Sequence, residues 1–142
     1  MRATFERNVD SLERIFAFTA ETLEREGLGA EIRTPVDFVL EELFTNVVKY
    51  GNRTEASVHV EVARLPTGVE VTLVEEDAVP FDPTNRPPVD TTLPIEDRVP
   101  GGMGLHLVGK LVDSWEYRYD DARREGRTTF RKTLAATDQG GR

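Results

Sequence analysis

The stretch Glu41-Glu42-Leu43-Phe44-Thr45-Asn46-Val47-Val48-Lys49-Tyr50 decides the fold of this chain. Its apolar residues continue a stripe with spacings of four, three and four, as in an amphipathic helix: Val36, Leu40, Leu43 and Val47. The preceding Thr34-Pro35 predicts the helix start, with threonine as the N-cap and proline at the first helical position. We expect the helix to end near Tyr50, where Gly51-Asn52 would form a left-handed cap and turn.

A second face of this helix is polar, because residues three and four apart stack on a helix: Glu42, Thr45, Asn46 and Lys49. A carboxylate can accept a proton, an amide oxygen suits a hard cation, and an ammonium group suits a phosphate. Taken alone, the segment is equally consistent with a core helix that has a solvated polar face.

Composition favours one soluble globular domain. The chain has 142 residues, of which 38% are hydrophobic and 31% are charged. Its formal net charge of −8 disfavours non-specific binding to nucleic acid or to anionic membranes. The absence of cysteine excludes disulfides and thiolate metal sites. The N-terminal residues lack the apolar core of a signal peptide, and no run has membrane-spanning length, so we expect a cytoplasmic location.

The rest of the chain alternates between helix and strand patterns. We predict a short strand over residues 3–8, a helix from Asn8 or Asp10 to about Glu26, a hairpin of strands 57–63 and 69–74, and strands over 115–119 and 127–134. Residues 120–126 would form the last turn. One domain would cover residues 1–134, and residues 135–142 would be a frayed tail.

Two further segments could contact a ligand. Residues 82–100 form a long, proline-rich connection of the kind often used as a lid, and Gly101-Gly102-Met103-Gly104 follows it at the start of a helix. Glycines let the backbone approach a phosphate, and amides at a helix N-terminus donate to it. A flexible connection is the alternative. The loop is neither a P-loop nor a dinucleotide fingerprint, because it lacks Gly-Lys-Ser/Thr and no strand leads directly into it.

The acidic strand end Glu75-Glu76-Asp77 is the third segment. A carboxylate there could accept a hydrogen bond from the exocyclic amino group of a purine, although acidic residues also commonly end strands at turns. The three segments are weak signals individually and much stronger in combination.

Together these motifs resemble a known superfamily of ATPases. Glu42-Leu-x-x-Asn46-x-x-Lys49-Tyr50 looks like the N-box of the superfamily that contains gyrase, heat-shock chaperones, histidine kinases and mismatch-repair proteins. Residues 76–83, Glu-Asp-Ala-Val-Pro-Phe-Asp-Pro, are similar to its first glycine box in the form found in anti-sigma factor serine kinases. Residues 101–108 resemble the second glycine box of that branch, and Arg127-Thr128-Thr129-Phe130 resembles its last strand.

The resemblance implies a Bergerat fold, an α/β two-layer sandwich. A mixed, mostly antiparallel sheet of about five strands would be covered on one face by about three helices. It also implies that Glu42 is the catalytic base, that Asn46 holds Mg²⁺, and that Lys49 lies near the phosphates. The residues that match the motifs, and that we therefore expect to contact ATP, are Asn46, Lys49, Tyr50, Glu76, Asp77, Ala78, Phe81, Gly101, Gly102, Met103, Gly104, Leu105, His106 and Thr129.

One departure from the family pattern concerns the adenine pocket. The aspartate that reads adenine in the family is matched by Glu76, and the glycine two residues later is matched by Ala78. The larger side chains would tighten or alter the pocket. Neither His59 nor His106 has the setting of a phosphorylated histidine, which would lie on a long dimerisation helix.

The resemblance implies a regulatory serine kinase whose substrate is a small anti-sigma antagonist protein and whose other partner is a sigma factor. A non-catalytic, ATP-dependent binding module and a nucleotide-free scaffold are the alternatives that the altered box leaves open. A homodimer is compatible with the sequence, whereas direct binding to nucleic acid or to a membrane is not expected.

Overall fold

A computed structural model of the chain describes residues 1–85 and 102–134. Most of the expected lid, together with Gly101, lies outside these residues, as does the expected tail over 135–142. Within the described residues, no helix is long and apolar enough to cross a membrane.

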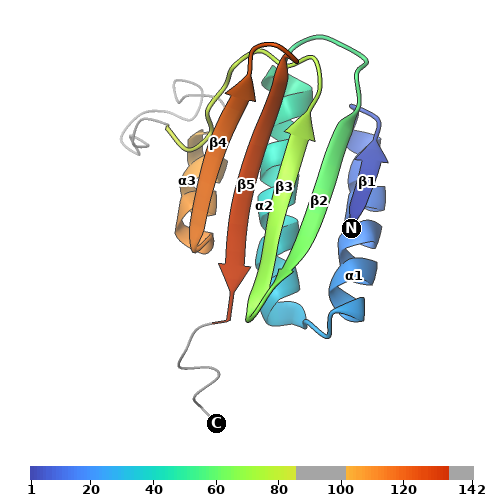
Figure 1. Ribbon diagram of the computed structural model, residues 1–142, viewed down its shortest axis with the longest axis vertical. Helices are drawn as coiled ribbons and strands as arrows, with labels where there is room; N and C mark the ends of the chain where they lie inside the picture. The colour runs from blue at the N-terminus through green and yellow to red at the C-terminus, as the bar shows by residue number, and fades with distance from the viewer. Residues whose placement is uncertain (86–101, 135–142) are drawn as a thin grey trace.

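Five strands form a single sheet in the order β1-β2-β3-β5-β4 (Figure 1). They are β1 (Arg2–Phe5), β2 (Val58–Leu65), β3 (Gly68–Glu75), β4 (Ser114–Asp120) and β5 (Glu125–Thr133). The expected five-stranded sheet is confirmed, and each of its four described pairings is antiparallel. The central strand β3 pairs with β5 on one side, where Leu73 lies opposite Thr128.

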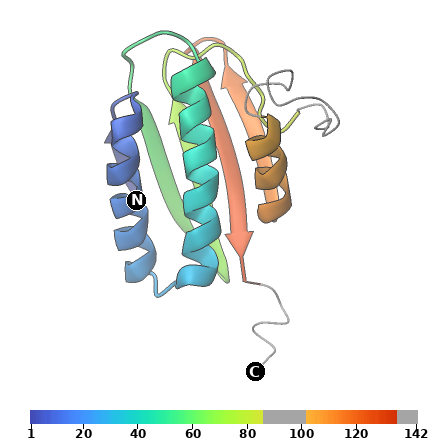
Figure 2. The ribbon, with the colours of Figure 1, turned by 180° about the vertical axis from the view of Figure 1, so that it is seen from behind.

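All the described helices pack on one face of this sheet (Figure 2). They are a 3₁₀ turn η1 (Val9–Ser11), α1 (Leu12–Arg25), α2 (Ala30–Tyr50) and α3 (Gly102–Leu111). Helix α2 crosses the middle of the sheet between α1 and α3. The expected stop of α1 is confirmed at Gly27, which has a φ of 71°.

The predicted start of the central helix at Thr34-Pro35 is wrong. Helix α2 begins at Ala30, after Gly29, and Pro35 lies inside it. The extra turn is stabilised by Ile32, which is buried in the core. Proline has no N–H to donate to the carbonyl of Glu31, which is an exposed residue, so water can satisfy that carbonyl.

The predicted left-handed cap at Gly51 is also wrong, since this residue has a φ of −78° and a ψ of −172°. Glycine is required at position 51 because neighbouring atoms approach its backbone closely. A β-carbon here would overlap the carbonyl oxygen of Val47 and lie 3.2 Å from the Glu75 carboxylate. The end of α2 is therefore held tightly against the end of β3.

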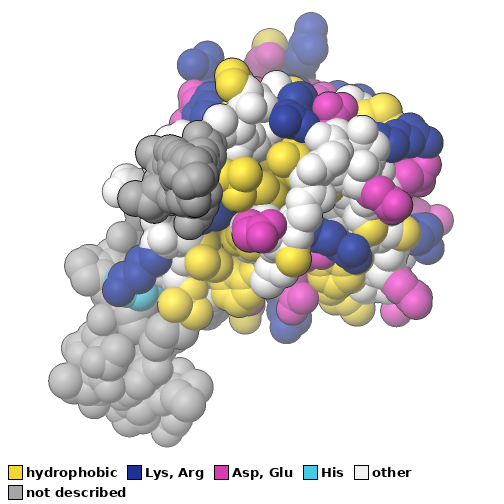
Figure 3. Space-filling model, turned by 90° about the horizontal axis from the view of Figure 1, so that it is seen from below, with side chains coloured by type: hydrophobic (Ala, Val, Ile, Leu, Met, Phe, Trp, Pro, Cys, Tyr) yellow, Lys and Arg dark blue, Asp and Glu magenta, His cyan; other side chains and the backbone are white. Residues whose placement is uncertain are grey.

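The core lies between the helices and the sheet, where Phe44 of α2 and Phe130 of β5 are fully buried. The other sheet face is lined by cross-strand ion pairs, such as Arg127 with Glu61 and Arg131 with Glu70. On the face seen in Figure 3, positively and negatively charged side chains are mixed, so the net negative charge is not concentrated in one patch there.

Candidate functional site

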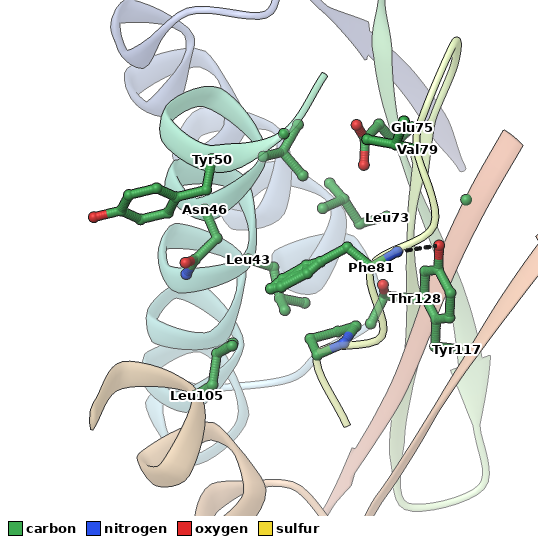
Figure 4. Close-up of a pocket in the computed structure, with 14 residues that line it drawn as sticks. Leu43, Asn46, Tyr50, Leu73, Glu75, Val79, Phe81, Leu105, Tyr117 and Thr128 are labelled. Atoms are coloured by element: carbon green, nitrogen blue, oxygen red, sulfur yellow. Dashed lines mark hydrogen bonds between the residues drawn. The ribbon is translucent and has the colours of Figure 1, made fainter. Parts of the chain in front are cut away.

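A pocket opens between the C-terminal half of α2 and the ends of strands β3, β4 and β5 (Figure 4). Its walls are mainly apolar, with a few polar groups among them, as is usual for small-molecule sites. The lining residues are Leu43, Asn46, Val47, Tyr50, Gly51, Leu73, Glu75, Val79, Phe81, Pro83, Leu105, Tyr117, Gly126 and Thr128. Leu105 brings the first turns of α3 to the pocket, next to α2.

Glu42 lies directly against the first turn of α3. A β-carbon added to Gly104 would overlap the Glu42 carboxylate, with only 2.7 Å to its Cδ. The glycine therefore leaves the space that the carboxylate occupies. The first turn of a helix favours anionic groups, because its N–H groups are not used within the helix. The expected catalytic glutamate and the second glycine box are thus brought together.

The Glu42 carboxyl is half-buried, and this burial is the main reason why its pKa is raised above the ordinary glutamate value. The negative charge of Glu41 raises the pKa further, whereas Lys49 lowers it. A raised pKa increases the basicity of the carboxylate, which suits a group that accepts a proton.

Asn46 lies one turn after Glu42 and lines the pocket. Its Nδ2 donates to the backbone carbonyl of Glu42 at 2.6 Å, which fixes the amide. Its Oδ1 is buried and has no hydrogen-bond partner within residues 1–85 and 102–134. A buried acceptor of this kind is costly unless a ligand satisfies it, so the residue fits a hard cation such as Mg²⁺.

Other protein ligands for a cation are not gathered here. Among the described residues, no three His, Cys, Asp or Glu side chains converge as a metal site.

Phe81 projects its ring into the pocket toward Leu43 of α2 (Figure 4). The segment that carries Phe81 is held by two tyrosines of β4. The Phe81 N–H donates to Tyr117 Oη at 3.1 Å, and Tyr119 Oη donates to the carbonyl of Ala78 at 2.7 Å. Ala78 itself is fully buried. The first glycine box is therefore attached to the β4–β5 hairpin.

The acidic strand end places Glu75, rather than Glu76, on the pocket wall. Residues of β3 alternate, so Glu75 shares the helix-covered face with Leu73 and Val71. Burial raises the pKa of Glu75, while its hydrogen bond and ion pair with Arg7 lower it.

Glu76 and Asp77 do not line the pocket. The Glu76 carboxylate contacts Nε2 of His59, a residue whose position in β2 alternates with the core residues Val58 and Val60. Asp77 has a φ of 48° and forms an ion pair with Arg124. This positive φ is a backbone conformation that glycine adopts most readily. Asp77 lies two residues after Glu75, which is the spacing between the aspartate and the glycine in the family motif.

In β5, as in β3, the residue that lines the pocket lies one position before the residue that the motif predicts. Thr128 lines the pocket, whereas Thr129 exchanges a hydroxyl hydrogen bond of 2.9 Å with Thr72 on the other face. Thr128, Glu75 and Tyr117 line the pocket but are absent from the ATP contacts that the motifs predict. The signal for Glu75 and Thr128 was strand alternation, because each lies two residues from a core residue: Leu73 in one case and Phe130 in the other.

The other residues that we expect to contact ATP differ in whether they line the pocket. Tyr50 lines the pocket and is 55% exposed, while Lys49 is exposed next to it on α2. His106 is also exposed, although it follows the pocket residue Leu105 on α3. Gly102 and Met103 form the first turn of α3, and Gly101 lies outside the described residues.

The family model of the histidine kinase-like ATPase domain matches residues 5–132. The chain belongs to this family. A search of the curated proteins found no match. The histidine kinase-like ATPase domain explains why the N-box helix, the strand ends and α3 meet at one pocket, and it assigns the protein to the ATP-binding domains with kinase- or ATPase-type activity.

Proposed function

We propose that this histidine kinase-like ATPase domain is an ATP-dependent serine kinase of the anti-sigma type, which phosphorylates a small antagonist protein. The observation that carries the proposal is the placement of Glu42 at the first turn of α3, one helical turn from the buried, unpaired Oδ1 of Asn46. Glu42 does not itself line the pocket, but it brings a proton acceptor to within one helical turn of a cation ligand that does, and phosphoryl transfer to a hydroxyl uses both kinds of group.

In the proposed reaction, the serine hydroxyl oxygen of the antagonist forms a bond to the γ-phosphorus of ATP. The bond between the γ-phosphorus and the oxygen that bridges it to the β-phosphorus breaks, and ADP leaves. The hydroxyl proton passes to the Glu42 carboxylate. The raised pKa of Glu42 favours this transfer, because it increases the proton affinity of the carboxylate at neutral pH.

Asn46 and Lys49 have supporting roles. Asn46 Oδ1 would hold Mg²⁺, which neutralises charge on the phosphates. Lys49 is exposed and forms no ion pair with any residue in the described parts of the chain, so its ammonium group is available to a phosphate.

The decisive experiment measures phosphate transfer from γ-labelled ATP to purified candidate antagonist proteins. Glu42→Gln keeps the length of the side chain but removes the proton acceptor. We expect transfer to fall by roughly 10² to 10⁴-fold, with ATP binding retained. Glu41→Gln is the matched control, because Glu41 is exposed and points about 100° away around the helix. Equal transfer in Glu42→Gln and Glu41→Gln would remove Glu42 from the mechanism.

A second candidate is a binding module that takes up ATP and sequesters its partner without transferring phosphate. It is favoured by the Phe81 ring, which projects into the pocket, and by the buried Ala78 methyl group in the first glycine box. Tight ATP binding by the wild type without transfer to a partner that it demonstrably binds would support this candidate over the kinase.

A further inference from the structure

We propose that Tyr117 is a positioning residue that holds the Phe81 ring in the apolar part of the pocket, where the ring competes with the base of a nucleotide. This inference rests on the proposed function, because it concerns access to the same ATP site. Tyr117 lies in β4, outside the segments that resemble the family motifs.

The Phe81 ring occupies the part of the pocket that is best suited to a base. It lies between α2 and the sheet and points toward Leu43 (Figure 4). Leu43, Leu73 and Leu105 give this part apolar walls, which an aromatic base needs to cover its faces. The groups that suit a cation or a phosphate are Asn46 and the first turn of α3. The ring therefore competes with the base rather than with the phosphates.

Little space remains beside the ring. The cavity volume is about 50 Å³, which holds a few water molecules. Sites for drug-sized ligands usually measure roughly 300–1,000 Å³. A nucleotide can therefore place its base between α2 and the sheet only after the Phe81 side chain has moved. Every contact that keeps the ring in place then lowers the apparent affinity for the nucleotide.

Tyr117 fixes the backbone that carries the ring. Its Oη accepts a hydrogen bond of 3.1 Å from the Phe81 N–H. The hydroxyl passes close to Gly126 of the neighbouring strand β5, where an added β-carbon would lie only 3.2 Å from Oη. Gly126 is buried and lines the pocket, so its lack of a side chain leaves room for the hydroxyl.

The segment before Phe81 is attached to the same hairpin. The Ala78 N–H donates to the carbonyl of Arg124, and the Ala78 carbonyl accepts from Tyr119 Oη, both at 2.7 Å. Both backbone groups of this buried residue are thus satisfied by β4 and the turn after it. Because Ala78 is fixed, a movement of the ring takes place in the residues that follow it. The hydrogen bond to Tyr117 is a contact that this movement would break.

A ring that stacks on the base is the alternative explanation, since aromatic side chains commonly cover bases in this way. The two explanations differ in the sign of one effect. Removal of a stacking ring lowers the affinity for a nucleotide, whereas removal of a competing ring raises it. Inorganic triphosphate has no base, so neither explanation predicts a change in its affinity.

The experiment measures calorimetric affinities of the full chain for Mg·ATP and for the magnesium complex of inorganic triphosphate. We expect Phe81→Ala to bind Mg·ATP about tenfold more tightly than the wild type, because no ring has to be displaced. Tyr117→Phe should bind it about threefold more tightly, because one hydrogen bond that holds the ring is lost. The affinity for triphosphate should be unchanged in both variants.

Val79→Ala is the matched control. Val79 lies in the same segment, lines the same pocket and is 45% exposed. Loss of an ordinary wall residue should not tighten the binding of Mg·ATP. If Phe81→Ala is too unstable to measure, Tyr117→Phe decides in its place, because it keeps both aromatic rings.

The outcomes separate the inference from the proposed function. Tighter Mg·ATP binding in Phe81→Ala supports the inference, even where binding by the wild type is too weak to detect. Equal or weaker binding in Phe81→Ala, or an equal gain for triphosphate or in Val79→Ala, overturns the inference and leaves the kinase proposal intact when the wild type binds Mg·ATP. A gain in Phe81→Ala without one in Tyr117→Phe removes Tyr117 as the positioning residue. No Mg·ATP binding by any of these proteins overturns both proposals.

Discussion

The Glu42 carboxylate occupies the space that a side chain on Gly104 would need. Two residues from different motifs, one in the N-box helix and one in the second glycine box, are therefore complementary in shape. The position of the carboxylate depends on the absence of a single methyl group in the helix packed against it.

Gly104→Ala should separate activity from stability. Alanine is favoured over glycine within a helix by up to about 1 kcal/mol, but its methyl group would displace the Glu42 carboxylate. We expect the helix to be retained and phosphate transfer to fall by about 10²-fold, because small misplacements of catalytic groups have effects of this size. Gly109→Ala is the matched control, since a β-carbon there meets only Trp115 at 3.7 Å. Equal transfer in both variants would show that the contact with Gly104 is not needed.

Asn46→Ala should remove the magnesium-dependent part of ATP binding. The variant deletes the buried Oδ1, which is the expected cation ligand, and also loses one hydrogen bond to the Glu42 carbonyl. Calorimetry with and without Mg²⁺ would measure the difference. Thr45→Ala is the control, because the Thr45 hydroxyl donates to the carbonyls of Glu41 and Glu42 and the residue does not line the pocket. If the wild type and Asn46→Ala respond alike to Mg²⁺, the metal role of Asn46 is wrong.

The pH dependence of transfer should follow the Glu42 carboxyl. Only the ionised form accepts a proton, so activity is lost as the pH falls through its pKa. Burial raises this pKa, and the acidic limb should therefore lie above that of an unperturbed glutamate. Lys49→Met removes a charge that lowers the pKa and should move the limb to higher pH, whereas Glu41→Gln removes a charge that raises it and should move the limb to lower pH. Rate profiles that shift in the same direction in both variants would contradict this assignment.

Replacement by valine should affect ATP affinity at Thr128 and stability at Thr129. Thr128→Val places a methyl group where a hydroxyl meets the pocket, so ATP affinity should fall several-fold. Thr129→Val breaks the hydrogen bond to Thr72 on the other face, so it should lower the free energy of unfolding by about 1 kcal/mol with ATP affinity unchanged. Urea unfolding and calorimetry on both variants provide the test, and a weaker affinity for ATP in Thr129→Val alone would reverse the assignment.

The sequence predicted the architecture well because its signals were long and periodic. The apolar stripe from Val36 to Val47 and the alternating strands specify which faces are buried, and the family motifs specify their order. The start of α2 was missed because Thr34-Pro35 is a good local start signal. The burial of Ile32 outweighs that signal, and this burial depends on tertiary packing.

The site was predicted less well than the fold, because the predicted pocket residues in the strands are displaced by one position from the observed ones. Matching the motif from the Pro80-Phe81 side places Glu76 at the base-reading position, but the alternation of β3 turns that side chain to the opposite face from Glu75. A shift of one residue along a strand moves a side chain to the other face of the sheet. The Arg7 contact could not be predicted at all, because only the folded sheet brings the segment after β1 to the end of β3.

The order of the strands has a consequence for how the protein folds. β2–β3 and β4–β5 are local hairpins, but β3 and β5 pair across a long stretch of chain, and the pocket lies on this seam between the hairpins. Contacts between distant segments form slowly, because the entropy of closing the intervening loop must be lost first. We therefore expect the pocket to be completed late, after both hairpins exist. A nucleotide that binds only the docked hairpins would slow unfolding rather than speed folding.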